Sequence, residues 1–225
     1  MDLYYSAVKW ILRLYQQILS QDFHVSGNLP LRPGAKIIAA NHPNATDGFF
    51  LPFIFQEKLH CFIQGDVFSV PFFGWLLAKS KQIPVWPAQK NAAFEMACGL
   101  LAGGKTVVIF PEGRLNPDCR PVEANTGAVR LSLLTGAAII PVGFFVPTQH
   151  LRRITIQKNG HPSQSRWQTS GCCYVHIGSP WLAGQEINRK GEETTVHELT
   201  ARLMERITAL AHQAALECVH EKLLV

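Results

Sequence analysis

Short apolar runs alternate along this chain with longer stretches in which apolar residues recur every three or four positions. Apolar runs bounded by turn formers are typical of buried strands, and the wider spacing is typical of helices with one buried face. The candidate strands are residues 36–40, 60–64, 81–85, 106–110, 139–145 and 173–177, and the candidate helices are residues 46–55, 71–79, 91–102 and 126–134. This alternation predicts an α/β fold with a central mixed or mostly parallel sheet flanked by helices.

The first 22 residues have the pattern of an amphipathic helix, ahead of a single domain that we place at residues 23–225. The apolar stripe of this helix consists of Tyr4, Val8, Ile11, Tyr15 and Ile18. Because Lys9 and Arg13 interrupt the stretch, it lacks the uncharged apolar length of a membrane span. Aromatic residues beside basic ones suit a helix that lies in a membrane interface. The same pattern suits equally well a helix packed on the domain core.

Toward the C-terminus the pattern changes from polar to helical. Residues 158–171 contain many turn formers and no apolar periodicity, which predicts an exposed loop. From residue 192 onward the pattern is that of one long amphipathic helix, with Thr194 or Thr195 as a candidate cap. Its apolar positions are Val196, Leu199, Leu203, Ile207, Leu210 and Ala214. We expect this helix to pack on the sheet.

Composition narrows the range of partners. Of the 225 residues 47% are apolar and only 16% are charged, a balance that favours a surface facing lipid or another protein. The net charge of +5 favours anionic partners, namely phospholipid head groups, phosphorylated small molecules or nucleic acid. No nucleic-acid-binding motif accompanies the scattered basic residues, so we expect no nucleic-acid partner.

Other features argue against a metal site, a secretory signal and a nucleotide-binding loop. The six cysteines include no CxxC pair and no histidine at zinc-finger spacing, so we expect neither a metal nor another bound cofactor. The N-terminus has no secretory signal pattern, which predicts a cytoplasmic location. Residues 99–106 match the spacing GxxxxGK[ST] of a phosphate-binding loop, but a helical pattern precedes them and a strand pattern follows, the reverse of the required context. Gly103 and Gly104 are better explained as the end of a helix.

Candidate chemistry begins in the segment NHPNATDG, at residues 41–48. A histidine acts as a general base when a carboxylate fixes its tautomer and orientation, and Asp47 is the obvious partner of His42. The gap of five residues does not match neighbours on a helix, so we expect the pair to meet across a strand-to-helix turn that contains Pro43 and Asn44. In the alternative interpretation, Asp47 or Thr46 only caps the next helix and His42 satisfies a local backbone group.

The segment FPEGR, at residues 110–114, follows the apolar run TVVI. Glu112, Gly113 and Arg114 should therefore emerge at the end of a strand, where α/β proteins place their ligand sites. Gly113 allows close approach of the backbone to a ligand, and the guanidinium of Arg114 is matched to a phosphate. The alternative is a simple turn with a solvated arginine.

Together, NHPNATD, FPEGR and the later IIPVGF at residues 139–144 resemble the glycerolipid acyltransferase family, which includes lysophosphatidic acid and glycerol-3-phosphate acyltransferases. The resemblance covers about half of the chain, residues 36–145. It implies that His42 is the general base, that Asp47 orients its ring, and that Glu112, Gly113 and Arg114 bind the acceptor. The acyl donor would be acyl-CoA or acyl-carrier protein, and the acceptor a lysophospholipid, most simply lysophosphatidic acid, or glycerol 3-phosphate. The enzyme would act in phospholipid biosynthesis as a peripheral protein on the inner face of a membrane.

The chain departs from the family pattern at several positions. Pro87 follows the strand IPV where the family usually has an arginine, and Lys81 or Lys90 would then be a substitute cation for the acceptor phosphate. Thr126 stands before Gly127 where a lysine is frequent, and Asn44 replaces a common serine. Two other functions remain open, a lipid-binding protein with little catalysis and an acyl-thioester hydrolase that uses the same histidine to activate water.

Overall fold

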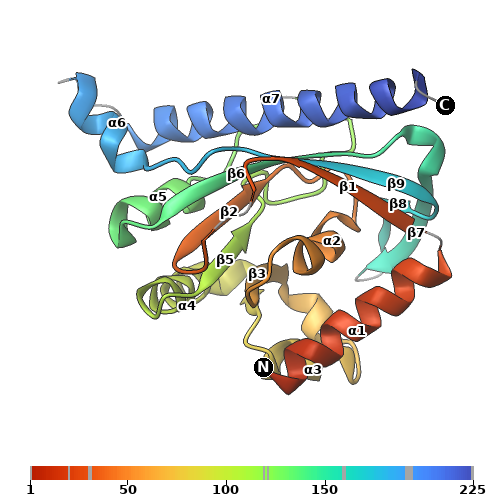
Figure 1. The fold of residues 1–225 in the computed structure, drawn as a ribbon. Helices are drawn as coiled ribbons and strands as arrows, with labels where there is room; N and C mark the ends of the chain where they lie inside the picture. The colour runs from red at the N-terminus through yellow and green to blue at the C-terminus, as the bar shows by residue number, and fades with distance from the viewer. Residues whose placement is uncertain are drawn as a thin grey trace.

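The computed structural model describes residues 2–19, 21–29, 32–118, 120, 122–158, 161–190 and 195–223. Within these residues seven strands form one sheet in the order β1-β9-β6-β2-β5-β3-β4 (Figure 1). All neighbouring strands are parallel except β6 and β9, so the prediction of a mostly parallel sheet flanked by helices is confirmed. The strands are β1 (Gln21–Gly27), β2 (Lys36–Ala40), β3 (Leu59–Gln64), β4 (Ile83–Val85), β5 (Thr106–Ile109), β6 (Ala138–Phe145) and β9 (Gly171–Ile177).

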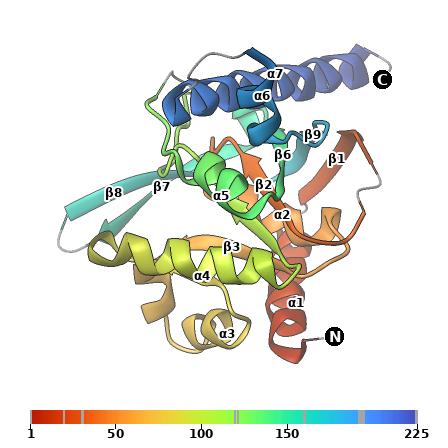
Figure 2. The same cartoon turned by 90° about the vertical axis from the view of Figure 1, so that its left-hand side faces the viewer.

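Strand β2 shows why the central strands are apolar throughout. Ile37 and Ala39 face one side of the sheet, Ile38 and Ala40 face the other, and all four side chains are fully buried. The first side is covered by α4 (Lys90–Ala102), α5 (Gly127–Thr135) and α7 (Val196–Leu223), and the second by α2 (Asp47–Ile54). In Figure 2, α7 runs along the top of the molecule, and α5 lies between it and α4.

Helix α1 (Leu3–Ile18) begins at Asp2, whose carboxylate accepts hydrogen bonds from the backbone N–H groups of Tyr4 and Tyr5 at 3.0 and 3.2 Å. One stripe of the helix, including Val8 and Leu12, packs on α3 (Phe73–Lys79). Another stripe is exposed although it is apolar, and it contains Leu3, Trp10, Leu14 and Ile18. The helix therefore both packs on the domain and presents apolar side chains to solvent.

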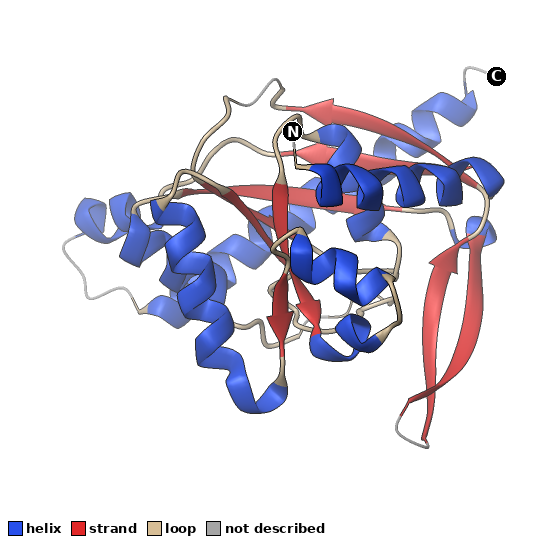
Figure 3. Ribbon diagram, turned by 90° about the horizontal axis from the view of Figure 1, so that it is seen from below, coloured by secondary structure: helices blue, strands red, loops and turns tan. Residues whose placement is uncertain are grey.

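The expectation of a loop at residues 158–171 is wrong for most of that stretch. Strands β7 (Leu151–Lys158) and β8 (His161–Gln168) pair as an antiparallel hairpin, and β9 begins at Gly171. Residues 159 and 160 lie outside the described residues. Figure 3 shows the hairpin extending away from the rest of the molecule. Only the base of this ribbon packs on the domain, for example through Trp167, so most of it needs no alternation of apolar and polar residues and the hydrophobic pattern that reveals other strands is missing.

Several smaller predictions are confirmed. Helix α4 ends at Ala102 and β5 begins at Thr106, with Gly104 at φ +73°, so the formal phosphate-loop match lies between a helix and a strand in the wrong order. The cap of α7 is Thr195. Its hydroxyl accepts from the N–H of Glu198 at 3.2 Å, and the Glu198 carboxylate accepts from the N–H of Thr195 at 2.8 Å. Thr194, the other candidate, lies outside the described residues.

The remaining described helices are α6 (Ala183–Lys190) and the short 3-10 helices η1 (Gly65–Ser69), η2 (Pro87–Gln89) and η3 (Thr148–His150). Among the described residues no helix is both long enough and apolar enough to cross a membrane.

Candidate active site

The two sequence motifs meet at the C-terminal ends of two central strands of the sheet. Strands β2 and β5 are parallel neighbours, so their C-terminal ends lie side by side. His42 follows β2 after one intervening residue, and the segment from Phe110 to Arg114 follows β5 directly. The fold thus brings together two segments that are about 70 residues apart in the chain. Such strand ends are where open α/β sheets place their ligand sites.

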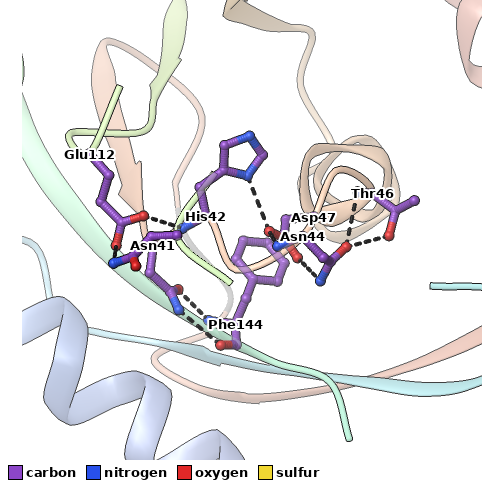
Figure 4. A network of polar contacts seen from close by, with 8 residues as sticks. Asn41, His42, Asn44, Thr46, Asp47, Glu112 and Phe144 are labelled. Carbon is purple, nitrogen blue, oxygen red and sulfur yellow. Dashed lines mark hydrogen bonds and ion pairs between the residues drawn. The ribbon is translucent and has the colours of Figure 1, made fainter. Parts of the chain in front are cut away.

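His42 and Asp47 form the predicted pair. Nδ1 of His42 lies 3.1 Å from Oδ2 of Asp47, the first residue of α2. The Asp47 side chain is completely buried, whereas that of His42 is 22% exposed. Figure 4 shows the ring standing clear of the loop with Nδ1 turned toward Asp47. When Nδ1 carries the proton that Asp47 accepts, Nε2 is left as the basic nitrogen.

Asn44 and Thr46 hold the Asp47 carboxylate in place. The backbone N–H of Asn44 donates to Oδ2 at 2.9 Å, and the Asn44 side-chain amide donates to Oδ1. Oδ1 of Asn44 in turn accepts from the N–H of Thr46 at 2.9 Å and from its hydroxyl. Thr46 therefore does not cap α2 through its side chain, which argues against the interpretation of this segment as a simple helix cap.

Burial raises the pKa of the Asp47 carboxyl, while the hydrogen bonds from His42 and Asn44 oppose this shift. Removing a carboxylate from water costs free energy, and the hydrogen bonds with His42 and Asn44 compensate part of this cost. The interaction with His42 is correspondingly strengthened by the low polarity around Asp47.

The FPEGR segment supports His42 by stacking and by hydrogen bonds. The ring of Phe110 stacks on the imidazole, with centroids 4.1 Å apart and planes inclined by 20°. The Glu112 carboxylate accepts from the backbone N–H of His42 at 3.2 Å and from the side-chain amide of Asn116 at 3.2 Å. The N–H of Asn116 donates to the carbonyl of His42 at 2.8 Å. Both backbone polar groups of His42 are thereby satisfied.

Glu112, Gly113 and Arg114 occupy three different environments. Glu112 is 7% exposed, and burial raises the pKa of its carboxyl. Gly113 has φ +65°, a left-handed backbone conformation that favours glycine, and a β-carbon there would also force the Asn125 side chain to move. Arg114 is exposed, and no carboxylate among the described residues forms an ion pair with it. Arg114 is thus the member of the motif that is open to a soluble anion, whereas Glu112 faces His42.

Asn41 is a site residue that the sequence did not single out. Its buried side chain accepts from the N–H of Phe144 at 2.7 Å and donates to the carbonyl of Phe144 at 3.0 Å. These bonds fix the end of β2 to β6, one residue before His42. The available signal was an asparagine at the end of an otherwise apolar strand, where an amide can satisfy a donor and an acceptor at once.

Comparisons with known proteins identify the family of the chain and its fold. The family model named Acyltransferase matches residues 22–144, more than half of the chain. The chain belongs to this family. It is 30% identical over 139 residues to a 1-acyl-sn-glycerol-3-phosphate acyltransferase of Pseudomonas aeruginosa, which covers 59% of this chain and 52% of the relative. It is 27% identical over 119 residues to a chloroplastic 1-acyl-sn-glycerol-3-phosphate acyltransferase of Arabidopsis thaliana, covering 51% of this chain and 33% of the relative.

The chain thus spans about half the length of the Pseudomonas relative and a third of the plant one. A crystal structure of the 1-acyl-sn-glycerophosphate (LPA) acyltransferase PlsC of Thermotoga maritima has the same fold. The TM-score is 0.66 at 20% identity, and the match covers 94% of this chain and 78% of that one.

In this chain of the acyltransferase family, Lys81 and Lys90 are the two candidates to replace an arginine at position 87. They lie at opposite ends of strand β4. Strand β4 is parallel to β3, and β3 to β5, so the C-terminal end of β4 lies at the same end of the sheet as His42. Lys81 precedes β4 and therefore lies toward the opposite end. Lys90 follows η2 and begins α4 at the same end as the site. Of the two, only Lys90 remains a candidate for contact with an acceptor.

Proposed function

We propose that this protein transfers a fatty acyl group from acyl-CoA or acyl-carrier protein to the free hydroxyl of 1-acylglycerol 3-phosphate, a step of phospholipid biosynthesis. The observation that carries the proposal is the His42–Asp47 pair, with Nδ1 of His42 facing a buried carboxylate and the ring partly open to solvent. The acceptor is chosen because the relatives from Pseudomonas and Arabidopsis both carry the name of this activity.

In the proposed reaction Nε2 of His42 removes the proton of the acceptor hydroxyl as its oxygen attacks the thioester carbonyl. A carbon–oxygen bond forms, and the carbonyl oxygen gains the negative charge of a tetrahedral intermediate. When the carbonyl re-forms, the carbon–sulfur bond breaks, and the departing thiolate takes the proton from Nε2. Asp47 stabilises the imidazolium while His42 holds the proton. The acyl group passes directly to the acceptor, so no serine or cysteine nucleophile is required.

Arg114 is the proposed contact for the acceptor phosphate. It follows the buried Glu112 in the same turn, is exposed, and carries a guanidinium that can form two parallel hydrogen bonds to phosphate oxygens. Glu112 supports this site indirectly, since its carboxylate is bound to the His42 backbone. Gly113, with φ +65°, allows the tight turn between Glu112 and Arg114.

The proposed setting is the inner, cytoplasmic face of a membrane, where the lipid acceptor and product reside. Support comes from a surface formed by α1 and the segment around α3, which we call the apolar surface. Each of its apolar residues has an exposed fraction between 41 and 77%. They are Leu3, Trp10, Leu14, Ile18, Val70, Phe72 and Trp75. Monomeric soluble proteins rarely expose so many large apolar residues on neighbouring elements.

The test is an acceptor screen with a labelled acyl thioester, followed by mass analysis of the products. We expect acylated 1-acylglycerol 3-phosphate from the wild-type protein and a loss of about 10²- to 10⁴-fold in His42→Ala, the usual effect of removing a general base. His197→Ala, an exposed histidine on α7, serves as the matched control and should keep full activity. Comparable melting of all three proteins shows that they are folded.

Two outcomes would contradict the proposal. Release of free thiol without an acylated lipid would identify an acyl-thioester hydrolase, in which water takes the place of the hydroxyl. Lipid binding without either product, unchanged in His42→Ala, would identify a lipid-binding protein on the same fold.

A further inference from the structure

The β7–β8 hairpin carries most of the net positive charge of the protein. Residues 151–170 contain four basic residues, Arg152, Arg153, Lys158 and Arg166, and no aspartate or glutamate, which gives a charge of +4. The whole chain has a net charge of +5. A segment of this charge attracts anions to whatever site lies beside it.

The base of the hairpin is attached to both loops of the candidate active site. The carbonyl of Arg166 accepts from the N–H of Ala45, within the loop that joins His42 to Asp47, at 2.8 Å. The Arg166 guanidinium donates to the carbonyl of Pro117 at 2.9 Å and to the carboxylate of Asp118 at 2.8 Å, in the loop after FPEGR. The hairpin is therefore held next to the site at one end and projects from it at the other (Figure 3).

The two faces of the hairpin differ. Directly opposed residues of an antiparallel pair share a face, so Arg153 lies with Arg166, and Arg152 lies with Trp167. Trp167 packs against Tyr15 of α1 and Phe49 of α2, which turns its face toward those helices. The opposite face, defined by Arg153 and Arg166 and here called the arginine face, is on the side of Asp118.

One carboxylate does not neutralise the arginines around it. Asp118 is paired with Arg166 at 2.8 Å and also with Arg120 at 3.5 Å. Arg153 is exposed, and no carboxylate among the described residues pairs with it. The arginine face therefore retains positive charge and a guanidinium that is available to a ligand. The guanidinium of Arg153 has the forked hydrogen-bond geometry that matches a phosphate group, and Arg166 beside it adds to the positive charge of this face.

The hairpin and FPEGR follow strands on opposite sides of β2, and their loops meet where Arg166 contacts Pro117 and Asp118. Strand β2, which leads to His42, lies between β5 and β6 in the sheet. FPEGR follows β5 on one side of His42, whereas the hairpin follows β6 on the other. If the acceptor binds at Arg114, as the proposed function states, the hairpin offers the second substrate a further cationic site beside the same two loops. Both coenzyme A and acyl-carrier protein carry a phosphate at the far end of the pantetheine chain.

We propose that the arginine face of the β7–β8 hairpin binds the phosphate of the pantetheine-linked acyl donor and so directs its thioester toward His42. This inference rests on the proposed function. It adds a donor-binding element outside residues 22–144, the part that the family model matches.

The test compares two neighbouring arginines on opposite faces. Binding of coenzyme A is measured by titration calorimetry with the wild-type protein, Arg153→Ala and Arg152→Ala, which remove the same charge from adjacent positions. We expect Arg153→Ala to weaken binding about tenfold, as for loss of a charge-assisted hydrogen bond, and Arg152→Ala to change it less than about twofold. Both arginines are exposed, so both variants should melt like the wild type.

A second titration with acyl-carrier protein bearing its pantetheine arm identifies the source of the phosphate. If Arg153→Ala weakens the binding of both probes, Arg153 contacts the phosphate that the two donors share. If it weakens the binding of coenzyme A alone, Arg153 contacts a phosphate that coenzyme A has and the carrier protein lacks. Weakening for the carrier protein alone would overturn the phosphate assignment in favour of acidic side chains. Equal weakening by the two variants would show a general field effect and overturn the assignment to one face.

Two further measurements separate this inference from other possibilities. His42→Ala should bind coenzyme A like the wild type, because binding does not require the base. If the wild-type protein acylated no acceptor, the proposed function alone would be contradicted. If Arg153→Ala kept the coenzyme A affinity of the wild type, this inference alone would be contradicted. If both arginine variants instead lower association with phosphatidylglycerol vesicles and leave coenzyme A binding unchanged, the hairpin contacts the membrane and the inference is wrong.

Discussion

Three buried asparagines determine where His42 lies. Asn41 joins the end of β2 to Phe144, Asn44 holds the Asp47 carboxylate, and Asn116 bonds both to Glu112 and to the His42 backbone. An amide carries donors and an acceptor without charge, so it can satisfy mixed backbone and carboxylate partners in a buried place. The charge at the site is thereby limited to the groups that the proposed reaction needs.

The spacing of His42 and Asp47 could be interpreted from the sequence because the two residues are five apart and a turn connects them. Contacts between residues that are distant in the chain could not be predicted from the sequence in this way. Asn41 and Phe144 are 103 residues apart, and nothing local to either residue indicates the other. The same holds for the stacking of Phe110 on His42, which depends on β2 and β5 being neighbours.

Glu112 provides a prediction about pH. Burial raises its pKa above the ordinary value of 4.5, so the folded protein holds this proton more tightly than the unfolded chain does. The contribution of Glu112 to the free energy of unfolding is therefore present at low pH and is lost as the pH rises through the raised pKa. In Glu112→Gln this loss is absent, and the variant should gain stability relative to the wild type as the pH increases.

Denaturant unfolding of both proteins at several pH values from about 4 to 8 measures the difference. Because Glu112 is coupled electrostatically to Asp47 and His42, the difference reports Glu112 together with its effect on these two groups. A difference that is independent of pH, or that falls as the pH rises, would show that the pKa of Glu112 is not raised.

At the scale of elements, α1 combines the two roles that the sequence left open. Its packed stripe fits against α3, and its exposed stripe belongs to the apolar surface. Phe72, which precedes α3, has φ +61° and is 69% exposed, an unusual conformation for a bulky residue. Its ring stacks on Trp75, with centroids 6.3 Å apart, so the strained backbone presents two aromatic rings on the same surface.

The apolar surface leads to a prediction with a matched control. Replacing Ile18, which is 70% exposed on α1, by serine should lower association with phospholipid vesicles several-fold, because an aliphatic side chain then no longer leaves water. Leu134, which is 68% exposed on α5, provides the control, and Leu134→Ser should bind vesicles like the wild type. Vesicle sedimentation measures both variants. Equal effects of the two substitutions, or none, would argue against the apolar surface as the membrane contact.

The hairpin shows where elements escape sequence analysis. Each strand of the main sheet is supported by a core, and burial produces the apolar runs that correctly predict β2, β3, β4, β5, β6 and β9. Strand β8 pairs only with β7 and is not part of the main sheet. Its sequence therefore does not need the continuous apolar run of a buried strand. Strand β1, at the edge of the sheet, was missed for a related reason, since QDFHVSG has no continuous apolar run.

At the scale of the whole molecule, the sequence predicted the class of fold but not the order of the strands. Alternating strands and helices imply parallel neighbours, and most neighbours are parallel. Strand β9 lies between β1 and β6 and is antiparallel to β6 alone, and this direction depends on the hairpin, which was not expected to contain strands. The position of β1 beside β9 joins segments about 150 residues apart in the chain, and local patterns do not report such a pairing.

The close contact between β6 and α7 shows that the part of the chain shared with relatives is shorter than the part needed for folding. The family match ends at residue 144, within β6, yet a β-carbon on Gly143 would lie 2.1 Å from the backbone nitrogen of Ala211 in α7. A fragment of residues 1–145 would lack both this helix and β9, and would expose one face and one edge of the sheet.

We expect this fragment to aggregate or to melt without a cooperative transition in circular dichroism, whereas the full chain melts cooperatively. A soluble, cooperatively melting fragment would show otherwise. The region that assigns this chain to the acyltransferase family is thus smaller than its folding unit, and gene fusions or truncations designed from the shared region alone would cut through the core.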